Sequence, residues 1–169
     1  LGLDNDIFCF NVESAVELEI INELAAAKNK VASIALRINP EVDAHTHAKI
    51  TTGMKENKFG INLSQLGGVL DKLKEMKHVK LIGIHSHIGS QITDMSSFRN
   101  LVIRFNEIQE ELEAHGVTVE NLNFGGGLGI DYYHPNHLSI PAFDNYFAAI
   151  HKLLQVRPGQ QVHFEPGRS

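Results

Sequence analysis

The run Gly125-Gly126-Gly127 directly follows a short apolar segment and is the most unusual chemical feature of the sequence. A backbone without Cβ atoms can come close to an anion, and its N–H groups can then converge on phosphate oxygens. A tight turn that needs positive φ would use glycine as well. The run lacks the spacing of the G-x-G-x-x-G dinucleotide motif. We therefore predict a phosphate-binding loop that is not of the dinucleotide type.

Two histidines, His85 and His87, stand two positions apart in the chain. On a β-strand such positions face the same side. We favour one packed histidine and one that stacks on an aromatic cofactor. A purely structural pair and a divalent metal site are the alternatives. The metal site would need further ligands from other strand ends, for which Asp131, His134 and His137 are available.

Glu165, Pro166, Gly167 and Arg168 form a third cluster. A carboxylate at a strand end can hold a pyridine nitrogen in its protonated form, which makes the ring an electron sink. An arginine three residues further on can pair with a phosphate or with a substrate carboxylate. Taken alone, the same four residues would also suit a capped turn with a surface ion pair.

The composition is that of a soluble globular domain. The 169 residues suit one domain, and 43% of them are apolar and 21% charged. The net charge of −5, without a Lys/Arg cluster, argues against nucleic acid as the main partner. A single cysteine, Cys9, and the lack of an apolar run of ~20 residues lead us to expect a cytoplasmic protein. Because the chain begins without methionine, we expect a piece of a longer protein.

Short apolar segments alternate with amphipathic ones along the whole chain. The pattern predicts strands over 7–12, 31–38, 79–87, 119–124 and 161–165, and helices over 14–27, 64–76, 97–115 and 141–154. Ser64 is the expected N-cap of the second helix, and Gly116 is expected to end the third. The polar stretch 39–61 is longer than most loops, and long loops are often functional. Strands that alternate with helices predict a parallel sheet.

The position of the polar clusters separates the two common folds that share this pattern. Asn11, the segments 37–40 and 85–91, the glycine run and the Glu165 cluster all stand at or just after predicted strands. A doubly wound sheet places its site at one switch point, whereas a barrel enzyme builds it from the carboxyl ends of many strands. We therefore predict an α/β fold, a partial (β/α)8 TIM barrel with about five parallel strands, as one domain over residues 1–169.

Together the clusters resemble the barrel of the fold-type III pyridoxal-phosphate enzymes, an alanine racemase-like group that includes ornithine, arginine and diaminopimelate decarboxylases. The resemblance rests on His87-Ile88-Gly89-Ser90-Gln91, Gly125-Gly126-Gly127-Leu128-Gly129 and Glu165-Pro166-Gly167-Arg168. Two further stretches, 37–43 and 52–61, resemble the diaminopimelate branch, and the segment 9–14 matches as well. The resemblance covers essentially the whole chain.

The resemblance implies a role for each cluster. His87 would stack on the ring of pyridoxal 5'-phosphate and Glu165 would pair with its ring nitrogen, so these two are the expected catalytic residues. Ser90 and the glycine run would hold the phosphate. The segment Pro166-Gly167-Arg168 would complete the cofactor contacts, with its arginine also binding the substrate. The implied reaction releases CO2 from the D-centre of meso-diaminopimelate and gives L-lysine.

The resemblance also implies parts that this stretch does not supply. Family members carry the Schiff-base lysine upstream of anything that matches this chain, and a carboxy-terminal β domain completes their site across a homodimer. None of the lysines considered closes a predicted strand: Lys28, Lys30, Lys55 and Lys58. We therefore expect the chain alone to be inactive, and the full protein to bind a small amino acid rather than nucleic acid or a membrane. Two alternatives stay open: a non-catalytic pyridoxal-phosphate-binding protein on the same barrel, and a metal-dependent barrel hydrolase that uses His85 and His87.

Overall fold

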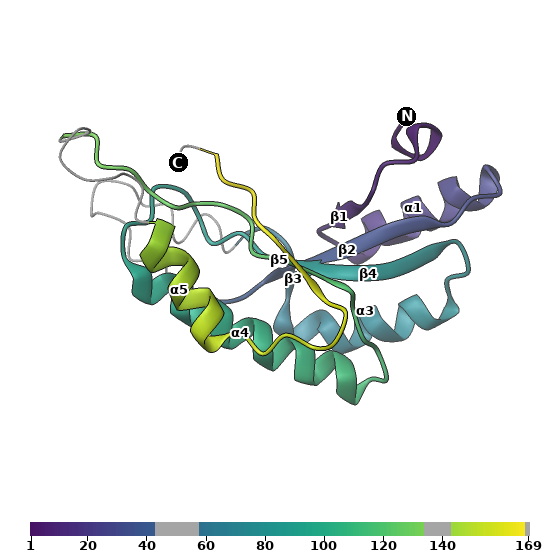
Figure 1. Cartoon of the computed structure of the whole chain (residues 1–169). Helices are drawn as coiled ribbons and strands as arrows, with labels where there is room; N and C mark the ends of the chain where they lie inside the picture. Colours follow the sequence, from purple (N-terminus) through teal and green to yellow (C-terminus); the bar gives the residue numbers. More distant parts are fainter. Residues whose placement is uncertain (43–57, 134–142, 168–169) are drawn as a thin grey trace.

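The computed structural model describes residues 1–42, 58–133 and 143–167, which form a parallel sheet with helices packed against it (Figure 1). The sheet has the order β1-β2-β4-β5-β6, and a short strand, β3, pairs with the carboxyl end of β2. The strands are β1 (Phe10–Val12), β2 (Ala32–Asn39), β3 (Ile61–Asn62), β4 (Val79–His85), β5 (Asn121–Asn123) and β6 (Gln161–His163). The helices are the 3-10 turn η1 (Gly2–Asn5), α1 (Ala15–Ala27), α3 (Leu63–Glu75), α4 (Met95–Ala114) and α5 (Phe143–Leu153).

The predicted alternation of strands and helices is confirmed, and every pair of strands is parallel. The strand β3 is an addition, because two residues are too few to show a period-2 pattern in the sequence. Asn11 lies within β1 and not after it. Gly116 ends α4 in the predicted way, with a φ of +74° that favours glycine.

Two helices begin earlier than predicted because an upstream side chain caps them. The N-cap of α3 is Asn62 and not Ser64. The side chain of Gln65 accepts a hydrogen bond from the backbone N–H of Asn62 at 3.3 Å, as in a capping box. In α4, the carboxylate of Asp94 accepts from the N–H of Ser96 at 2.9 Å, so the helix begins two residues before the predicted position.

The helices α3, α4 and α5 lie on one side of the sheet, and the other side is open (Figure 1). Large aromatic side chains fill the layer between sheet and helices. Phe105 of α4 stacks on Phe124, which directly follows β5, with ring centroids 4.0 Å apart. Phe98 of α4 meets Tyr146 of α5 edge-on at 4.7 Å. Burial of such a side chain is worth ~1.5–3 kcal/mol, so this layer holds the sheet against the helices.

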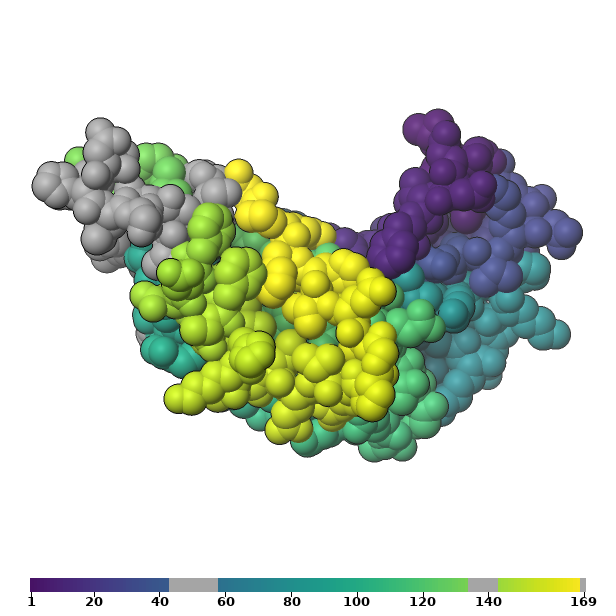
Figure 2. All heavy atoms as spheres, in the orientation of Figure 1, coloured from purple at the N-terminus to yellow at the C-terminus, as the bar shows by residue number. Residues whose placement is uncertain are grey.

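The open side of the sheet is concave. In the space-filling view the surface is hollowed between the amino-terminal segment, in purple, and the carboxyl-terminal segment, in yellow (Figure 2). Within the described residues β1 and β6 are the two edges of the sheet and do not pair with each other. The fold is therefore the predicted α/β partial barrel, with its interior face accessible.

The strand register places four polar residues side by side at the carboxyl ends of the strands. Arg37 of β2 pairs with His85 of β4. His85 pairs in turn with Asn123 of β5, and Asn123 with His163 of β6. Register partners in adjacent strands point to the same face of a sheet. Because the residues that alternate with them in β2, β4 and β5 belong to the apolar core, this row faces the open side.

Candidate functional site

The glycine run joins three loops at the carboxyl ends of β4, β5 and β6. A Cβ atom on Gly126 would lie 2.2 Å from the carbonyl oxygen of Glu165, after β6. A Cβ atom on Gly127 would lie 2.2 Å from the carbonyl oxygen of Gly89, after β4. Real Cβ atoms do not approach backbone oxygens this closely. The glycines are therefore required first for the packing of one loop against the other two, and not only for the approach of an anion.

Two of the three N–H groups in the run already have acceptors within the protein. The N–H of Gly125 donates to Oδ1 of Asn123 at 2.9 Å, and the N–H of Gly126 donates to Nδ1 of His87 at 3.2 Å. Gly127 is the member for which no N–H acceptor lies among the described residues. Two of the N–H groups that the sequence led us to expect around a phosphate are thus already bonded to neighbouring side chains.

His87 lies in the loop after β4 and not on the strand, because β4 ends at His85. The prediction that both histidines occupy one strand is therefore wrong, although both lie near the glycine run. His87 is half-buried, and its bond from Gly126 fixes the ring with Nδ1 as the acceptor. Ser90, three residues further along the same loop, is exposed. The loop thus presents an oriented imidazole and a hydroxyl beside the glycine run.

Glu165 presents a carboxylate to the open side of the sheet. Its Oε1 accepts a hydrogen bond from Nδ2 of Asn123 at 2.8 Å, and its Oε2 lies 3.4 Å from Nε2 of His85. The Glu165 side chain is 51% exposed, so one side of the carboxylate stays accessible to a ligand. The loop that carries it is tied down, because the backbone N–H of Glu165 donates to the carbonyl of Gly125 at 2.8 Å.

His85 is buried beneath this carboxylate and is only 4% exposed. Burial lowers the pKa of its imidazole, an effect that the charge of Glu165 opposes and the charges of Arg37 and His87 reinforce. Neither ring nitrogen has a hydrogen-bond partner within the described part of the chain. His85 therefore forms the floor of the site, where the carboxylate of Glu165, 3.4 Å from its Nε2, is its nearest charged neighbour.

Sequence reasoning assigned no role to three residues that organise this region. Asn123 contacts both the glycine run and Glu165, and its only sequence signal is its place two residues before the run. Arg37 forms a 2.6 Å ion pair with Glu13 and lies with its guanidinium carbon 5.4 Å from the ring centroid of Phe59. Gln91, at a φ of +61°, donates to and accepts from the backbone of residue 130 and so joins the loops after β4 and β5.

Several predicted residues lie outside the described ranges: Arg168, Lys55, His134 and His137. Pro166 and Gly167 are described and exposed. In residues 1–42, 58–133 and 143–167 no group of three or more His, Cys, Asp or Glu side chains is arranged to hold a metal ion. In the same ranges no helix is long and apolar enough to span a bilayer.

Several lysines are engaged in surface ion pairs away from the site. Lys28 and Lys30, after α1, bind Asp4 and Asp6 at 2.8 and 2.7 Å. Lys74 of α3 pairs with Asp71 on the same helix, and Lys80 at the amino end of β4 pairs with Glu120. These pairs lie on helices or at the amino ends of strands.

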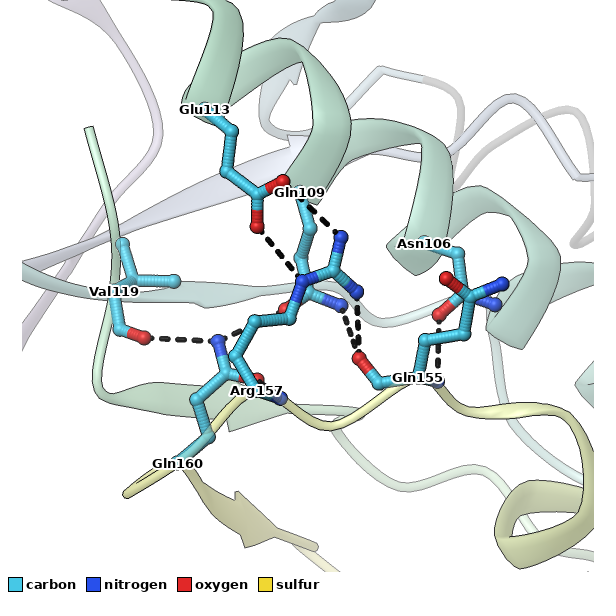
Figure 3. A network of polar contacts seen from close by, with 7 residues as sticks. All are labelled: Asn106, Gln109, Glu113, Val119, Gln155, Arg157 and Gln160. Carbon is cyan, nitrogen blue, oxygen red and sulfur yellow. Dashed lines mark hydrogen bonds and ion pairs between the residues drawn. The ribbon is translucent and has the colours of Figure 1, made fainter. Parts of the chain in front are cut away.

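A hollow of about 390 Å³ lies at the amino ends of the strands and not at the site. Polar side chains of α4 and of the segment before β6 line it and pair with one another (Figure 3). The hollows lined by Gly125 and Gly126 and by His87 have volumes of only about 30 and 10 Å³. A small-molecule pocket usually holds ~300–1,000 Å³. The candidate site is therefore an open face in this part of the chain, and we identify it by its chemistry and not by its volume.

At adjacent strand ends, the parallel barrel segment brings together a glycine loop, an oriented histidine and an exposed carboxylate. This combination is typical of one class of protein, the barrels that bind a phosphorylated aromatic cofactor. The chain belongs to the pyridoxal-dependent decarboxylases, because residues 2–169 match the pyridoxal binding domain of that family. The cofactor of this family is pyridoxal phosphate, which agrees with the cofactor expected from the sequence.

Three relatives that match nearly the whole chain are named diaminopimelate decarboxylase. The chain is 60% identical over 169 residues to a diaminopimelate decarboxylase of Bacteroides thetaiotaomicron, and covers 44% of that protein. A crystal structure of diaminopimelate decarboxylase from M. jannaschii in complex with L-lysine is 37% identical, with a TM-score of 0.82 over 99% of this chain and 39% of that one. The Helicobacter pylori enzyme complexed with L-lysine is 34% identical, with a TM-score of 0.85 over 99% and 41%. The chain thus spans about two-fifths of the length of these relatives.

Proposed function

We propose that the chain is the pyridoxal-phosphate-binding barrel domain, over residues 1–169, of a diaminopimelate decarboxylase. The reaction converts meso-2,6-diaminopimelate to L-lysine and CO2. The observation that carries the proposal is the joining of His87, the glycine run and Glu165 by direct contacts at the ends of three adjacent strands. The 60% identity to a protein of that name supports the choice of substrate.

The residues present fit the cofactor. When bound, pyridoxal phosphate withdraws electrons from the carbon that loses CO2. Glu165 would hold a proton on the ring nitrogen, for which its exposed carboxylate is available. His87 would cover one face of the ring in the orientation that Gly126 fixes. Gly127 and Ser90 are the groups of the strand-end loops open to the phosphate, and Gly125 and Gly126 shape the loop around it.

Other parts of the proposal rest on the resemblance. Arg168, outside the described residues, would bind the phosphate region and the substrate carboxylate. The full protein would be a homodimer in the cytoplasm. No contact among the described residues favours a metal-dependent hydrolase or a carrier without catalysis.

The test is CO2 release from meso-diaminopimelate by the full-length protein with added pyridoxal phosphate. LL-diaminopimelate is the matched control substrate, because it lacks the D-centre. We expect turnover with the meso isomer only. A Glu165→Gln variant removes a charge-assisted contact of ~1.5–3 kcal/mol, so kcat should fall roughly ten- to a hundredfold. Equal turnover of both isomers, or none above cofactor alone, would refute the proposed reaction.

The 169-residue chain by itself should not exceed the rate of free pyridoxal phosphate. The family chemistry needs a lysine that forms an imine with the cofactor. Positioning also matters, since misplacement by ~1 Å can cost about a hundredfold in rate. CO2 release above the cofactor-only control would mean that a lysine of this chain reaches the site. Lys55 and Lys58 would then be the first to replace.

A further inference from the structure

Asn123 occupies the one position in the described site that contacts both the glycine run and Glu165. Its Oδ1 accepts the N–H of Gly125 at 2.9 Å, and its Nδ2 donates to Oε1 of Glu165 at 2.8 Å. The backbone N–H of Glu165 donates to the carbonyl of Gly125 at 2.8 Å. These three bonds form a closed ring of contacts through the ends of β5 and β6.

We propose that Asn123 is a positioning residue that couples the phosphate-binding loop to the carboxylate of Glu165. The inference rests on the proposed function, in which these groups hold the two ends of one cofactor. A primary amide suits the position because it accepts and donates at once. An aspartate could accept from Gly125 but would place a second carboxylate against Glu165. A leucine would lose both bonds.

Of the described neighbours of the Glu165 carboxylate, Asn123 makes the shorter contact. His85, its register partner on β4, has its Nε2 3.4 Å from Oε2 of Glu165, a longer contact than the 2.8 Å bond from Asn123. His163, the partner on β6, directs its Nε2 to Asn121 at 2.8 Å and not toward Glu165. The orientation of Glu165 therefore depends on a bond that crosses 42 positions of the sequence.

Asn121 provides a matched control on the same strand. It lies two residues earlier and so points to the same face, one layer deeper. Its amide bonds the carbonyl of Ile82 and the ring of His163, and is not bonded to the glycine run or to Glu165. A charge or an apolar group at this position perturbs the barrel interior without cutting the ring of contacts.

The experiment compares N123D, N123L, N121D and N121L in the full chain, with two probes. Deoxypyridoxine 5'-phosphate has the ring and phosphate of the cofactor but no aldehyde, so its affinity does not depend on a lysine. Inorganic phosphate reports on the loop alone. We expect N123D to weaken the ring-containing probe at least tenfold while phosphate binding is kept, and N123L to weaken both. The two Asn121 variants should keep both affinities.

A double variant distinguishes a positioning role of Asn123 from a general loss of structure at the site. If Asn123 acts through Glu165, N123D should add nothing to the loss that E165Q already causes in affinity for deoxypyridoxine phosphate. Additive losses, or equal losses in N123D and N121D, would overturn the proposal.

Failure of the proposed function gives a different result. Wild-type protein would then bind neither probe, and hydrogen exchange still tests the coupling. The Gly125 amide should be protected in the wild type, N123D and N121D, and exchange faster in N123L. Unchanged protection in N123L would show that the Asn123 contact does not hold the loop.

Discussion

The polar side chains at the amino ends of the strands are hydrogen-bonded to one another, whereas those at the carboxyl ends are partly exposed or lack hydrogen-bond partners among the described residues. At the amino ends, Gln109 of α4 is only 2% exposed, yet its oxygen accepts from Gln160 at 2.8 Å and its amide donates to the carbonyl of Gln155 at 3.3 Å (Figure 3). At the carboxyl ends, Glu165 stays half exposed and His85 is buried with neither ring nitrogen bonded to a described residue.

The difference agrees with a division of the sheet between stability at the amino ends and the proposed binding site at the carboxyl ends. A fully satisfied polar network rigidifies the structure around it, whereas an unsatisfied buried group costs free energy. The amino-end network closes on itself and fastens the segment before β6 to α4. The carboxyl-end network keeps groups directed to the open face. In barrel proteins the carboxyl ends carry the active site and the amino ends carry stability, and the site proposed here follows that division.

Gly126→Ala is expected to have the largest effect. It should disrupt the carboxyl-end network and leave the amino-end network intact. The added Cβ would lie 2.2 Å from the carbonyl oxygen of Glu165, and neither backbone can give way easily. Overpacking of this kind costs ~1–3 kcal/mol and occasionally more, and we expect a loss at the upper end together with loss of deoxypyridoxine phosphate binding. Urea unfolding and a binding titration measure the two effects.

Gly68→Ala is the control for this substitution. Gly68 lies in α3, and nothing stands within 4 Å of its Cβ position. Alanine there should raise the free energy of unfolding by ~1 kcal/mol and leave binding unchanged. If both variants lose binding, the close packing of the glycine run is not the cause.

The second prediction concerns the amino-end network. Gln160→Ala removes the partner of Gln109 and of the Val119 carbonyl, which Gln160 reaches at 2.9 Å. A buried group without a partner costs ~1–3 kcal/mol, so the free energy of unfolding should fall by that amount. Cofactor affinity should not change. A fall in cofactor affinity with unaltered stability would show that the two ends are coupled through β6. It would contradict the assignment of stability to the amino ends and of binding to the carboxyl ends.

A third prediction uses pH to probe the carboxyl ends. The folded-state pKa of His85 is lowered, chiefly by burial, so protonation favours the unfolded chain. Stability from this group is present above the ordinary pKa of 6.5 and is lost as the pH falls below it. A His85→Phe variant should show a flatter dependence of the urea midpoint between pH 7 and pH 5 than the wild type. An identical slope in both would mean that His85 is not the group responsible.

The smallest effect is expected at the surface of the amino-end network. Nε of Arg157 donates to Glu113 at 2.7 Å, and this hydrogen bond holds the pKa of the carboxyl below its ordinary value of 4.5. Stability from Glu113 is therefore present above pH 4.5 and lost as the pH falls through the lowered pKa. Arg157→Gln should reduce the loss of stability between pH 5 and pH 3, and high salt should diminish the difference. If high salt left the difference between the variant and the wild type unchanged, the Arg157–Glu113 contact would not be its cause.

The order of elements, the parallel sheet and the chemical clusters at the strand ends could be predicted from the sequence. These features are local: an apolar period, a capping side chain or a glycine after a helix depends on neighbours a few positions away. Gly116 shows this, since its place after α4 and its positive φ follow from the helix it ends. The glycine run and Glu165 could be singled out in the same way, because their residue types and their place after predicted strands are also local features.

Which groups of those clusters contact one another depends on long-range strand pairing and packing. The register that aligns Arg37, His85 and Asn123 comes from strand pairing between distant segments, and no local pattern encodes it. The same pairing brings Asn123 to Glu165, 42 positions away, and gives the N–H groups of Gly125 and Gly126 their acceptors. Residue types predicted the chemistry of the site, whereas long-range packing determined which of its donors remain open to a ligand.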